Sequence, residues 1–428
     1  MSVCCRKRKG ERIKGAWRLL KRRTVIGLAI CLLCVALGNV TLGEAAQTVF
    51  TPETSSPWAG KDPTENYWTL PMDITDEAAV WRMLTQPITI VDTGKGDFRT
   101  QVNLYAEPDK NSEKTGLVTS KSQGVHVLET RDDGWSLIEC YSSSFAKTKV
   151  EMWNLLVRGY IPTEYLKTVE PDQHLALLVD KLTQRMYVFV DGKLFSTVLV
   201  STGHVEWNGS KYQPYNETRS GEFLLVGKVS SFSSGNMVCN MAVRFNAGDM
   251  MHEVPYIKGS NGNRNYAFCE NKLGTKASHG CIRVQRKKTP EGVNMKWLWD
   301  EIEKCEGKVK LAIWEDWQGR QIPVPADDTV LYRDPAKPEK WHRSETCYAA
   351  EDKVLEPFTY AELDREENAG MTACPYCCPE RRSTEIAEIN QLYAPGGDHD
   401  ELMTQLRQEA QEKRDKKKER EKQKQQKK

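Results

Sequence analysis

Residues 278–284 read Ser-His-Gly-Cys-Ile-Arg-Val, and this heptapeptide places a cysteine in a tight turn two positions after a histidine. The glycine between them lets backbone amides approach a substrate carbonyl, because no Cβ stands in the way. A thiol that attacks an acyl group needs a base for its proton and amide donors for the developing oxyanion. The heptapeptide therefore predicts a nucleophile, Cys281, in a turn whose own amides form the oxyanion hole, those of His279, Gly280 and Cys281.

A histidine upstream, His252, completes a pattern that resembles a known family. Ser278 follows His252 by 26 positions, and the order is histidine, gap, then Ser-His-Gly-Cys-apolar-Arg. This order resembles the L,D-transpeptidases with the YkuD catalytic domain, and the resemblance covers residues 172–316. The gap is longer than is usual in the family, and the turn-rich run 259–265 predicts an extra loop there. A second departure is Arg219, which stands where the family's Thr-Pro-x-Gly-x-Phe turn usually has proline.

The resemblance implies a role for each residue of the motif. His252 is expected to take the proton of Cys281 and later to return it, while the backbone carbonyl of Glu253 holds the imidazole tautomer. His279 either orients the site or is a structural hydrogen-bonding histidine. Arg283 is expected to support the turn or a substrate carboxylate. The remaining candidate site residues, Ser278 and Gly280, belong to the turn itself.

The reaction that the resemblance implies acts on the peptide stems of peptidoglycan. Cys281 would form a thioester with a tetrapeptide donor, release D-alanine and pass the acyl group to an amine of a second stem. No cofactor is expected for this catalysis. Two alternatives stay open: with water as the acceptor the enzyme would be an L,D-carboxypeptidase, and with a dismantled site the chain would be a membrane-tethered wall-binding protein.

The fold that the sequence predicts is mainly β. Residues 88–170 alternate short β segments with turns and resemble a bacterial SH3 domain, a small barrel expected to bind or position. Residues 172–316 form the β-rich catalytic candidate, with an Asp191-Gly192 hairpin turn between two strand patterns. Residues 43–87 are expected to be a linker that ends in a short helix over 77–84.

The N-terminus predicts an export segment. Residues 1–23 carry a net charge of +9, and residues 24–42 are apolar and without charge. Their length suits a membrane-spanning anchor with the basic segment on the cytoplasmic side. A cleavable signal sequence is the alternative. The body is expected outside the cytoplasm in both cases, either held at the cell membrane by a single span or secreted to the cell wall.

Charge is distributed unevenly along the chain. The tail at 401–428 carries +5, which leaves −12 for residues 24–400 of the total of +2. An acidic body argues against general nucleic-acid binding. Residues 383–428 are expected to form a solvated charged tail, partly helical or disordered.

Residues 336–382 contain a Cys/His-rich module. Four residues separate a histidine from a cysteine, and after a further 26 residues comes a Cys-x2-Cys pair. The pattern suits a tetrahedral zinc site and is similar to small Ada-type metal-binding modules. A disulfide-closed loop is the alternative, because an exported protein permits it. The candidate ligands are His342, Cys347, Cys374 and Cys377.

Overall fold

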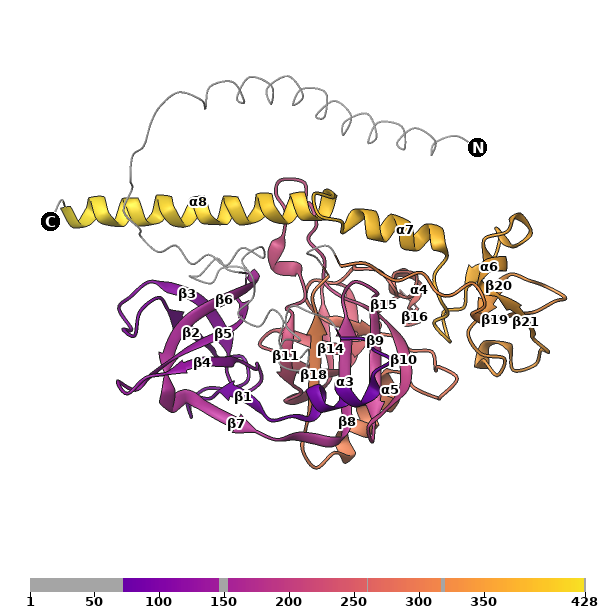
Figure 1. Ribbon diagram of the computed structural model, residues 1–428, viewed down its shortest axis with the longest axis horizontal. Coiled ribbons are helices and arrows are strands. Elements are labelled where there is room, and N and C mark those ends of the chain that lie inside the picture. The colour runs from indigo at the N-terminus through magenta and orange to yellow at the C-terminus, as the bar shows by residue number, and fades with distance from the viewer. Residues whose placement is uncertain (1–71, 146–152, 260, 317–319, 427–428) are drawn as a thin grey trace, which may run out of the picture. The chain divides into compact units, whose positions relative to one another are not determined.

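The computed structural model describes residues 72–145, 153–259, 261–316 and 320–426 (Figure 1). The predicted basic segment 1–23, the predicted anchor or signal 24–42 and most of the predicted linker 43–87 lie outside these residues. Within them the strands form sheets of two, five, eleven and four strands. The described part of the chain is therefore mainly β, as predicted. None of its helices combines the length and the apolar character that a membrane crossing requires.

Helix α3 (Glu77–Thr85) opens the described chain and confirms the helix predicted at 77–84. The carboxylate of Asp76 caps it by accepting the amide N–H of Ala79 at 3.1 Å. The helix buries Val80, Met83 and Leu84 in a cluster with residues of strands β8 and β9. This segment of the predicted linker therefore packs against the catalytic sheet.

A five-stranded antiparallel sheet follows, with its own core. Its order is β3-β2-β6-β5-β4, and Leu104, Ile138 and Ile161 are fully buried within it. A separate strand pair, β1 with β7, flanks it. The predicted SH3-like character of this unit stays a prediction. The bounds are β1 (Ile88–Val91), β2 (Gln101–Tyr105), β3 (Lys114–Thr119), β4 (His126–Thr130), β5 (Trp135–Ser143), β6 (Trp153–Pro162), the 3-10 turn η1 (Thr163–Tyr165) and β7 (Leu166–Val169).

The eleven-stranded sheet carries the motif residues. Its order is β11-β18-β8-β9-β10-β17-β14-β13-β15-β16, with β12 paired to β13. Two of its pairs are parallel, β18 with β8 and β14 with β17. The bounds are β8 (Pro171–Asp180), β9 (Arg185–Val190), β10 (Lys193–Ser201), β11 (Gly221–Leu224), β12 (Gly227–Ser234), β13 (Met237–Asn246), β14 (Asp249–Glu253), β15 (Tyr256–Lys258), β16 (Arg264–Asn265), β17 (Ile282–Val284) and β18 (Lys308–Trp314).

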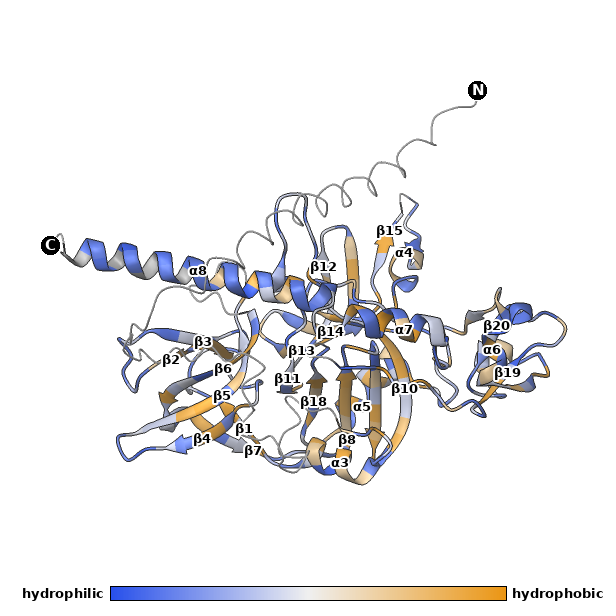
Figure 2. Ribbon diagram, turned by 45° about the horizontal axis from the view of Figure 1, so that its top comes forward, coloured by the Kyte–Doolittle hydropathy of each residue, from blue (hydrophilic) through white to orange (hydrophobic). Residues whose placement is uncertain are grey.

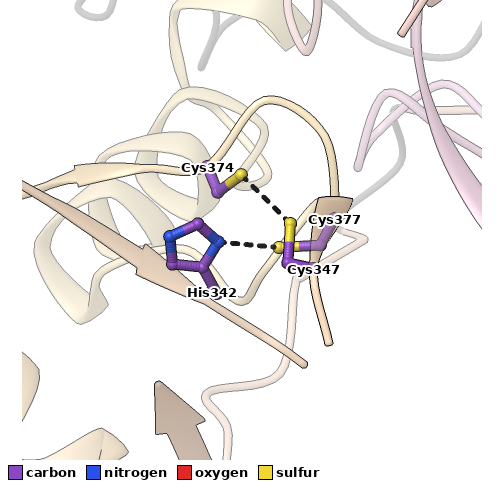
Figure 3. Close-up of side chains that lie close together, drawn as sticks. All are labelled: His342, Cys347, Cys374 and Cys377. Carbon is purple, nitrogen blue, oxygen red and sulfur yellow. Dashed lines mark hydrogen bonds between the residues drawn. The ribbon is translucent and has the colours of Figure 1, made fainter. Parts of the chain in front are cut away.

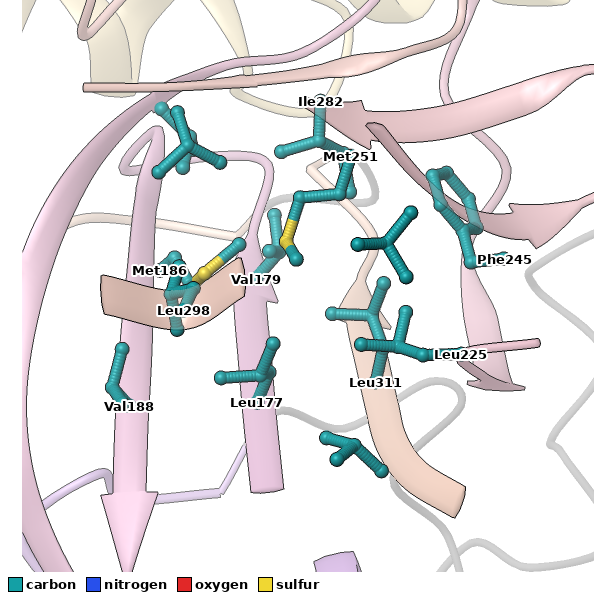
Figure 4. Close-up of a cluster of buried hydrophobic side chains, with 14 of the residues drawn as sticks. Leu177, Val179, Met186, Val188, Leu225, Phe245, Met251, Ile282, Leu298 and Leu311 are labelled. Atoms are coloured by element: carbon teal, nitrogen blue, oxygen red, sulfur yellow. The ribbon is translucent and has the colours of Figure 1, made fainter. Parts of the chain in front are cut away.

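The core of this sheet lies between its strands and helix α5 (Met295–Lys304) (Figure 4). Leu298 of α5 is fully buried there beside side chains from β8, β9 and β18. Met251 of β14 and Ile282 of β17 also point into this core. Since side chains alternate along a strand, the next residues, His252 and Arg283, point to the opposite face. The motif residues therefore share one face of two neighbouring strands.

The predicted hairpin between β9 and β10 is confirmed. Asp191 and Gly192 connect the two strands and have φ of +49° and +85°. Positive φ at both central residues is what a two-residue hairpin turn requires, and Asp-Gly suits it.

Residues 330–373 hold a small four-stranded sheet in the order β21-β19-β20-β22. Its core has six buried residues, among them Leu331, Trp341 and Phe358. The elements are β19 (Val330–Arg333), β20 (Lys340–His342), η3 (Tyr348–Ala350), β21 (Glu356–Thr359), α6 (Tyr360–Leu363), η4 (Glu366–Asn368) and β22 (Thr372–Ala373).

The C-terminal tail is helical over most of its length, in α7 (Ser383–Leu392) and α8 (Asp398–Gln426). Figure 2 shows α8 as largely hydrophilic. Its first half nevertheless has an apolar contact face, because Leu402, Leu406 and Ala410 recur every four residues and pack near Trp153. The tail is thus more ordered than the charge pattern predicts.

Candidate active site

Parallel pairing of β14 and β17 brings the two halves of the motif together. His252 is the register partner of Arg283, and Met251 is the partner of Ile282. Cys281 directly precedes β17, and its sulfur accepts a hydrogen bond from the backbone of Met250. The chain between the strands forms β15, β16, the helix α4 (Ala267–Glu270) and a loop. The chain in the long gap therefore adds β15 and β16 to the same sheet, as an excursion beyond β13, and leaves His252 on the strand beside the cysteine.

The surroundings of His252 fix its tautomer and keep its imidazole neutral, as a general base requires. Its side chain is buried, and its Nδ1 lies 2.7 Å from the carbonyl oxygen of Glu253, which fixes the proton on Nδ1 and leaves Nε2 free to accept. This is the hydrogen bond that the resemblance implies. The pKa of His252 is lowered to about 4, mainly by burial and to a smaller extent by the positive charge of Arg283, while the hydrogen bond to Glu253 opposes the shift. The imidazole is therefore neutral at pH 7.

Cys281 is half-buried, and burial raises its pKa to about 12. The carboxylate of Asp249 adds to the rise, whereas the Met250 amide and Arg283 oppose it. The thiol of Cys281 and the imidazole of His252 are therefore both neutral at pH 7. Such a pair needs general-base assistance at the moment of attack, since the thiol alone gives almost no thiolate.

The turn before Cys281 is fixed by hydrogen bonds from neighbouring segments. The hydroxyl of Thr218 donates to the carbonyl of Gly280 at 2.9 Å and accepts the amide of Gly203 at 2.7 Å. The hydroxyl of Ser278 donates to the carbonyl of Cys281. Both carbonyls therefore have side-chain hydroxyl groups as hydrogen-bond partners. The side chain of Ser278 thus stabilises the turn.

Gly280 has a conformation that other residues rarely adopt. Its φ is +117°, and a Cβ built on it would lie 2.3 Å from Asp249 Oδ1. Both the backbone angle and the space therefore require glycine. This closeness also places the carboxylate of Asp249 directly against the turn.

Asp249 and Arg219 form a buried pair that the motif does not contain. Arg219 Nη1 lies 3.3 Å from Asp249 Oδ2, and the same guanidinium donates to the carbonyls of Tyr215, Glu217 and Ser144. Burial raises the pKa of Asp249 to about 6, although the arginine opposes this. In the sequence, this pair was indicated only by the arginine at position 219, where the family's turn usually has proline.

His279 and Arg283 lie at the edge of the site. The side chain of His279 is 54% exposed, and its Nε2 lies 3.0 Å from Glu206 Oε1. The partner of this ring nitrogen is therefore the carboxylate of a loop residue. The side chain of Arg283 is buried and makes no ion pair with any residue in the described ranges.

The predicted metal ligands converge in the small module. His342, Cys347, Cys374 and Cys377 are all buried, and their ligand atoms lie within 4.8 Å of one another (Figure 3). The three cysteines are free thiols. This group could hold a metal ion.

A second group of acidic residues, Glu217, Glu315 and Asp316, is paired with two lysines. The buried Lys181 Nζ lies 3.0 Å from Glu217 and 2.8 Å from Glu315, and Lys276 Nζ lies 2.6 Å from Asp316. These contacts make the group a buried ion-pair network.

The sequence of the chain matches one protein-family model. Residues 175–324 match the family model YkuD, described as an L,D-transpeptidase catalytic domain. No curated protein matches the chain. Similar solved structures include an L,D-transpeptidase of Xylanimonas cellulosilytica, at 18% identity and a TM-score of 0.23, over 33% of this chain and 61% of that one.

Two mycobacterial structures are also similar. The L,D-transpeptidase of Mycobacterium smegmatis has 12% identity and a TM-score of 0.26, over 54% of this chain and 91% of that one. An L,D-transpeptidase of Mycobacterium tuberculosis H37Rv has 13% identity and a TM-score of 0.24, over 51% of this chain and 100% of that one. Residues 175–324 thus match the YkuD family of L,D-transpeptidase catalytic domains.

Proposed function

We propose that the chain is a peptidoglycan L,D-transpeptidase with Cys281 as its nucleophile. The observation that carries the proposal is the pairing of β14 with β17, which places a buried, neutral His252 on the strand beside the Cys281 turn. The family match of residues 175–324 supports the reaction class. The wall-binding alternative required a dismantled site, and the folded excursion between His252 and Ser278 argues against it.

The chemistry follows from the protonation states. His252 Nε2 takes the thiol proton as the Cys281 sulfur attacks the carbonyl carbon before the terminal D-alanine. The amides at Gly280 and Cys281 stabilise the oxyanion, because Gly280 carries no Cβ and its carbonyl is held by Thr218. The tetrahedral adduct collapses to a thioester, and His252 returns the proton to the leaving amine of D-alanine.

The second half-reaction reverses these roles. An amine of another stem attacks the thioester carbonyl, His252 takes the amine's proton, and Cys281 leaves as the thiol. We propose that the buried cation of Arg283 pairs with a stem carboxylate. These steps use only groups of the chain, and we propose that the Cys/His-rich module is a structural zinc site outside the reaction centre.

The proposal also includes the location of the chain and the way it is positioned at the cell wall. We propose that residues 24–42 anchor or export the body, so that the domain meets peptidoglycan outside the cytoplasm. The antiparallel unit at 88–170 is proposed to bind or position the wall polymer. Both proposals rest on the sequence patterns at these positions.

The test incubates the full chain with a purified disaccharide-tetrapeptide and follows the products by mass spectrometry. A cross-linked dimer with loss of one D-alanine, absent for Cys281→Ala, is the expected result. Loss of D-alanine without a dimer would replace the proposal by an L,D-carboxypeptidase. No reaction from the folded wild-type chain would refute catalysis on this stem.

A further inference from the structure

The four side chains of the Cys/His-rich module have the spacing of a metal site and not of a disulfide. Cys347 Sγ lies 3.7 Å from Cys374 Sγ, and Cys377 Sγ lies 3.7 Å from His342 Nδ1. A disulfide brings two sulfurs to about 2.0 Å. A tetrahedral zinc ion with Zn–S bonds of about 2.3 Å separates its ligand atoms by roughly 3.5–3.8 Å. The observed separations match this tetrahedral edge.

The surroundings of the ligands suit thiolates. The backbone amides of Tyr376 and Arg343 each donate to a sulfur at 3.4 Å, those of Cys374 and Cys377 respectively. Such outer hydrogen bonds orient ligand sulfurs and stabilise their charge. The ligands also come from neighbouring strands, since β20, which ends at His342, pairs in parallel with β22, which ends just before Cys374.

The module has a structural need for a metal. Its apolar core is limited to six buried residues, which is a small source of stability for some 50 residues. A metal that joins the segment at 342–347 to the segment at 374–377 would close the long connection between them. Binding energy of this kind acts directly as folding energy.

The segment after the last ligand is bound to the catalytic domain. Arg381 Nη2 donates to the carbonyl of Gly274 at 2.9 Å and to that of Thr183 at 3.0 Å. Arg185 Nη2 donates to the carbonyl of Pro379 at 2.6 Å. Gly274 lies in the loop that leads into the Ser278 turn, so residues 374–382 connect the candidate metal group to the loop before the nucleophile.

A second contact comes from the residue that follows His342. Arg343 pairs with Glu291 through both carboxylate oxygens at 3.1 and 3.0 Å, and its Nε donates to the carbonyl of Cys377. One guanidinium thus joins the ligand turn to the catalytic domain. Residues next to the first and the last of the four ligands in the sequence therefore both contact the catalytic domain.

We propose that His342, Cys347, Cys374 and Cys377 bind one zinc ion, and that this ion positions the loop before Cys281 through residues 374–382. Three thiols lose their protons on binding, so the loaded site carries three thiolates and a neutral imidazole around Zn2+. The ion takes no part in the reaction. The positioning role rests on the proposed function of Cys281, whereas the zinc site does not.

The metal site is tested on the full chain, purified without chelator, by elemental analysis and by cobalt substitution. One zinc per chain and the absorption of a tetrahedral cobalt–thiolate centre are expected, and Cys374→Ser should lose both. Cys378→Ser is the matched control, because Cys378 is a buried free cysteine of the same turn outside the four-residue group. A chain without metal whose intact mass lacks two hydrogens would overturn the site in favour of a disulfide.

A second measurement keeps the metal site testable if Cys374→Ser fails to fold. The wild-type chain is treated with a strong chelator, and its thermal unfolding is followed before and after zinc is returned. Loss of the module's stability and its recovery with zinc are expected. An unchanged unfolding curve after complete zinc removal would overturn the structural role.

The positioning role is tested with Arg381→Ala and the control Arg365→Ala. Arg365 belongs to the same module, but its ion pair is local, with Glu362. Arg381→Ala should keep one zinc per chain, change the rate of Cys281 alkylation and lower D-alanine release about tenfold, as misplacement of a catalytic group does. Equal alkylation rates in Arg381→Ala, Arg365→Ala and wild type would overturn the coupling. If the wild type releases no D-alanine, the proposed function fails, and metal content and alkylation still decide this inference.

Discussion

Replacing Thr218 by valine removes a single hydroxyl and keeps the shape of the side chain. That hydroxyl is fully buried and joins two backbone groups, the amide of Gly203 at 2.7 Å and the carbonyl of Gly280 at 2.9 Å. In Thr218→Val both groups lose their partner inside the protein. A buried polar group left unpaired costs about 1–3 kcal/mol, and we expect a loss of about 3 kcal/mol for the two together.

The serine variant separates the hydroxyl from the methyl group. Thr218→Ser keeps both hydrogen bonds and removes one buried methyl, which costs about 1 kcal/mol. Urea unfolding followed by tryptophan fluorescence gives both changes in the free energy of unfolding. We expect Thr218→Val to be less stable than Thr218→Ser by about 2 kcal/mol.

Catalysis should follow the same order. Without its hydroxyl partner the Gly280 carbonyl can rotate, and the amides of the turn move from the oxyanion position. We expect thioester formation at Cys281 to fall about 10- to 100-fold in Thr218→Val and to stay near the wild-type rate in Thr218→Ser. If the two variants unfold at the same urea concentration and acylate equally fast, the hydroxyl does not hold the turn and this account of Gly280 is wrong.

Three further predictions concern buried ionisable groups. Asp249→Asn should shift the alkylation midpoint of Cys281 to lower pH, because the carboxylate contributes to its raised pKa; an unchanged or higher midpoint would contradict this. With the pKa of His252 lowered to about 4, the rate of thioester formation should fall with acid only below about pH 4, and a pH–rate profile bending near 6.5 would count against a neutral buried base. Lys181→Met leaves buried carboxylates without their cation and should destabilise by about 3–5 kcal/mol in urea unfolding, whereas the exposed Lys193→Met should match wild type; equal midpoints would refute the network.

Local patterns predicted the parts of the site that depend on neighbours in the chain. The turn at Asp191-Gly192 follows from the φ that those residues tolerate, and the hydrogen bond from His252 to Glu253, which the family resemblance implied, joins adjacent residues. The mainly β class followed in the same way from alternating apolar residues. Each of these features is decided within a few residues.

Partners distant in the sequence could not be predicted. The Arg219–Asp249 pair joins residues 30 positions apart, and only the absence of the usual proline pointed to it. The contact face of α8 was missed because it depends on Trp153, which lies far earlier in the chain. In the Cys/His-rich module, spacing alone left zinc and disulfide open, since both join the same residues. Distances between the sulfurs separate the two, and distances come only with the fold.

The long gap between His252 and Ser278 shows why spacing is a weak guide to catalytic geometry here. β14 and β17 run parallel, so the chain must return to the same end of the sheet before it enters β17. A parallel connection takes a dozen or more residues whatever its content. Extra length in this chain enters the connection, as the β15–β16 hairpin and α4, and leaves the pairing of His252 with Arg283 unchanged. The register of the two strands therefore determines whether base and nucleophile meet, and an insertion between them does not.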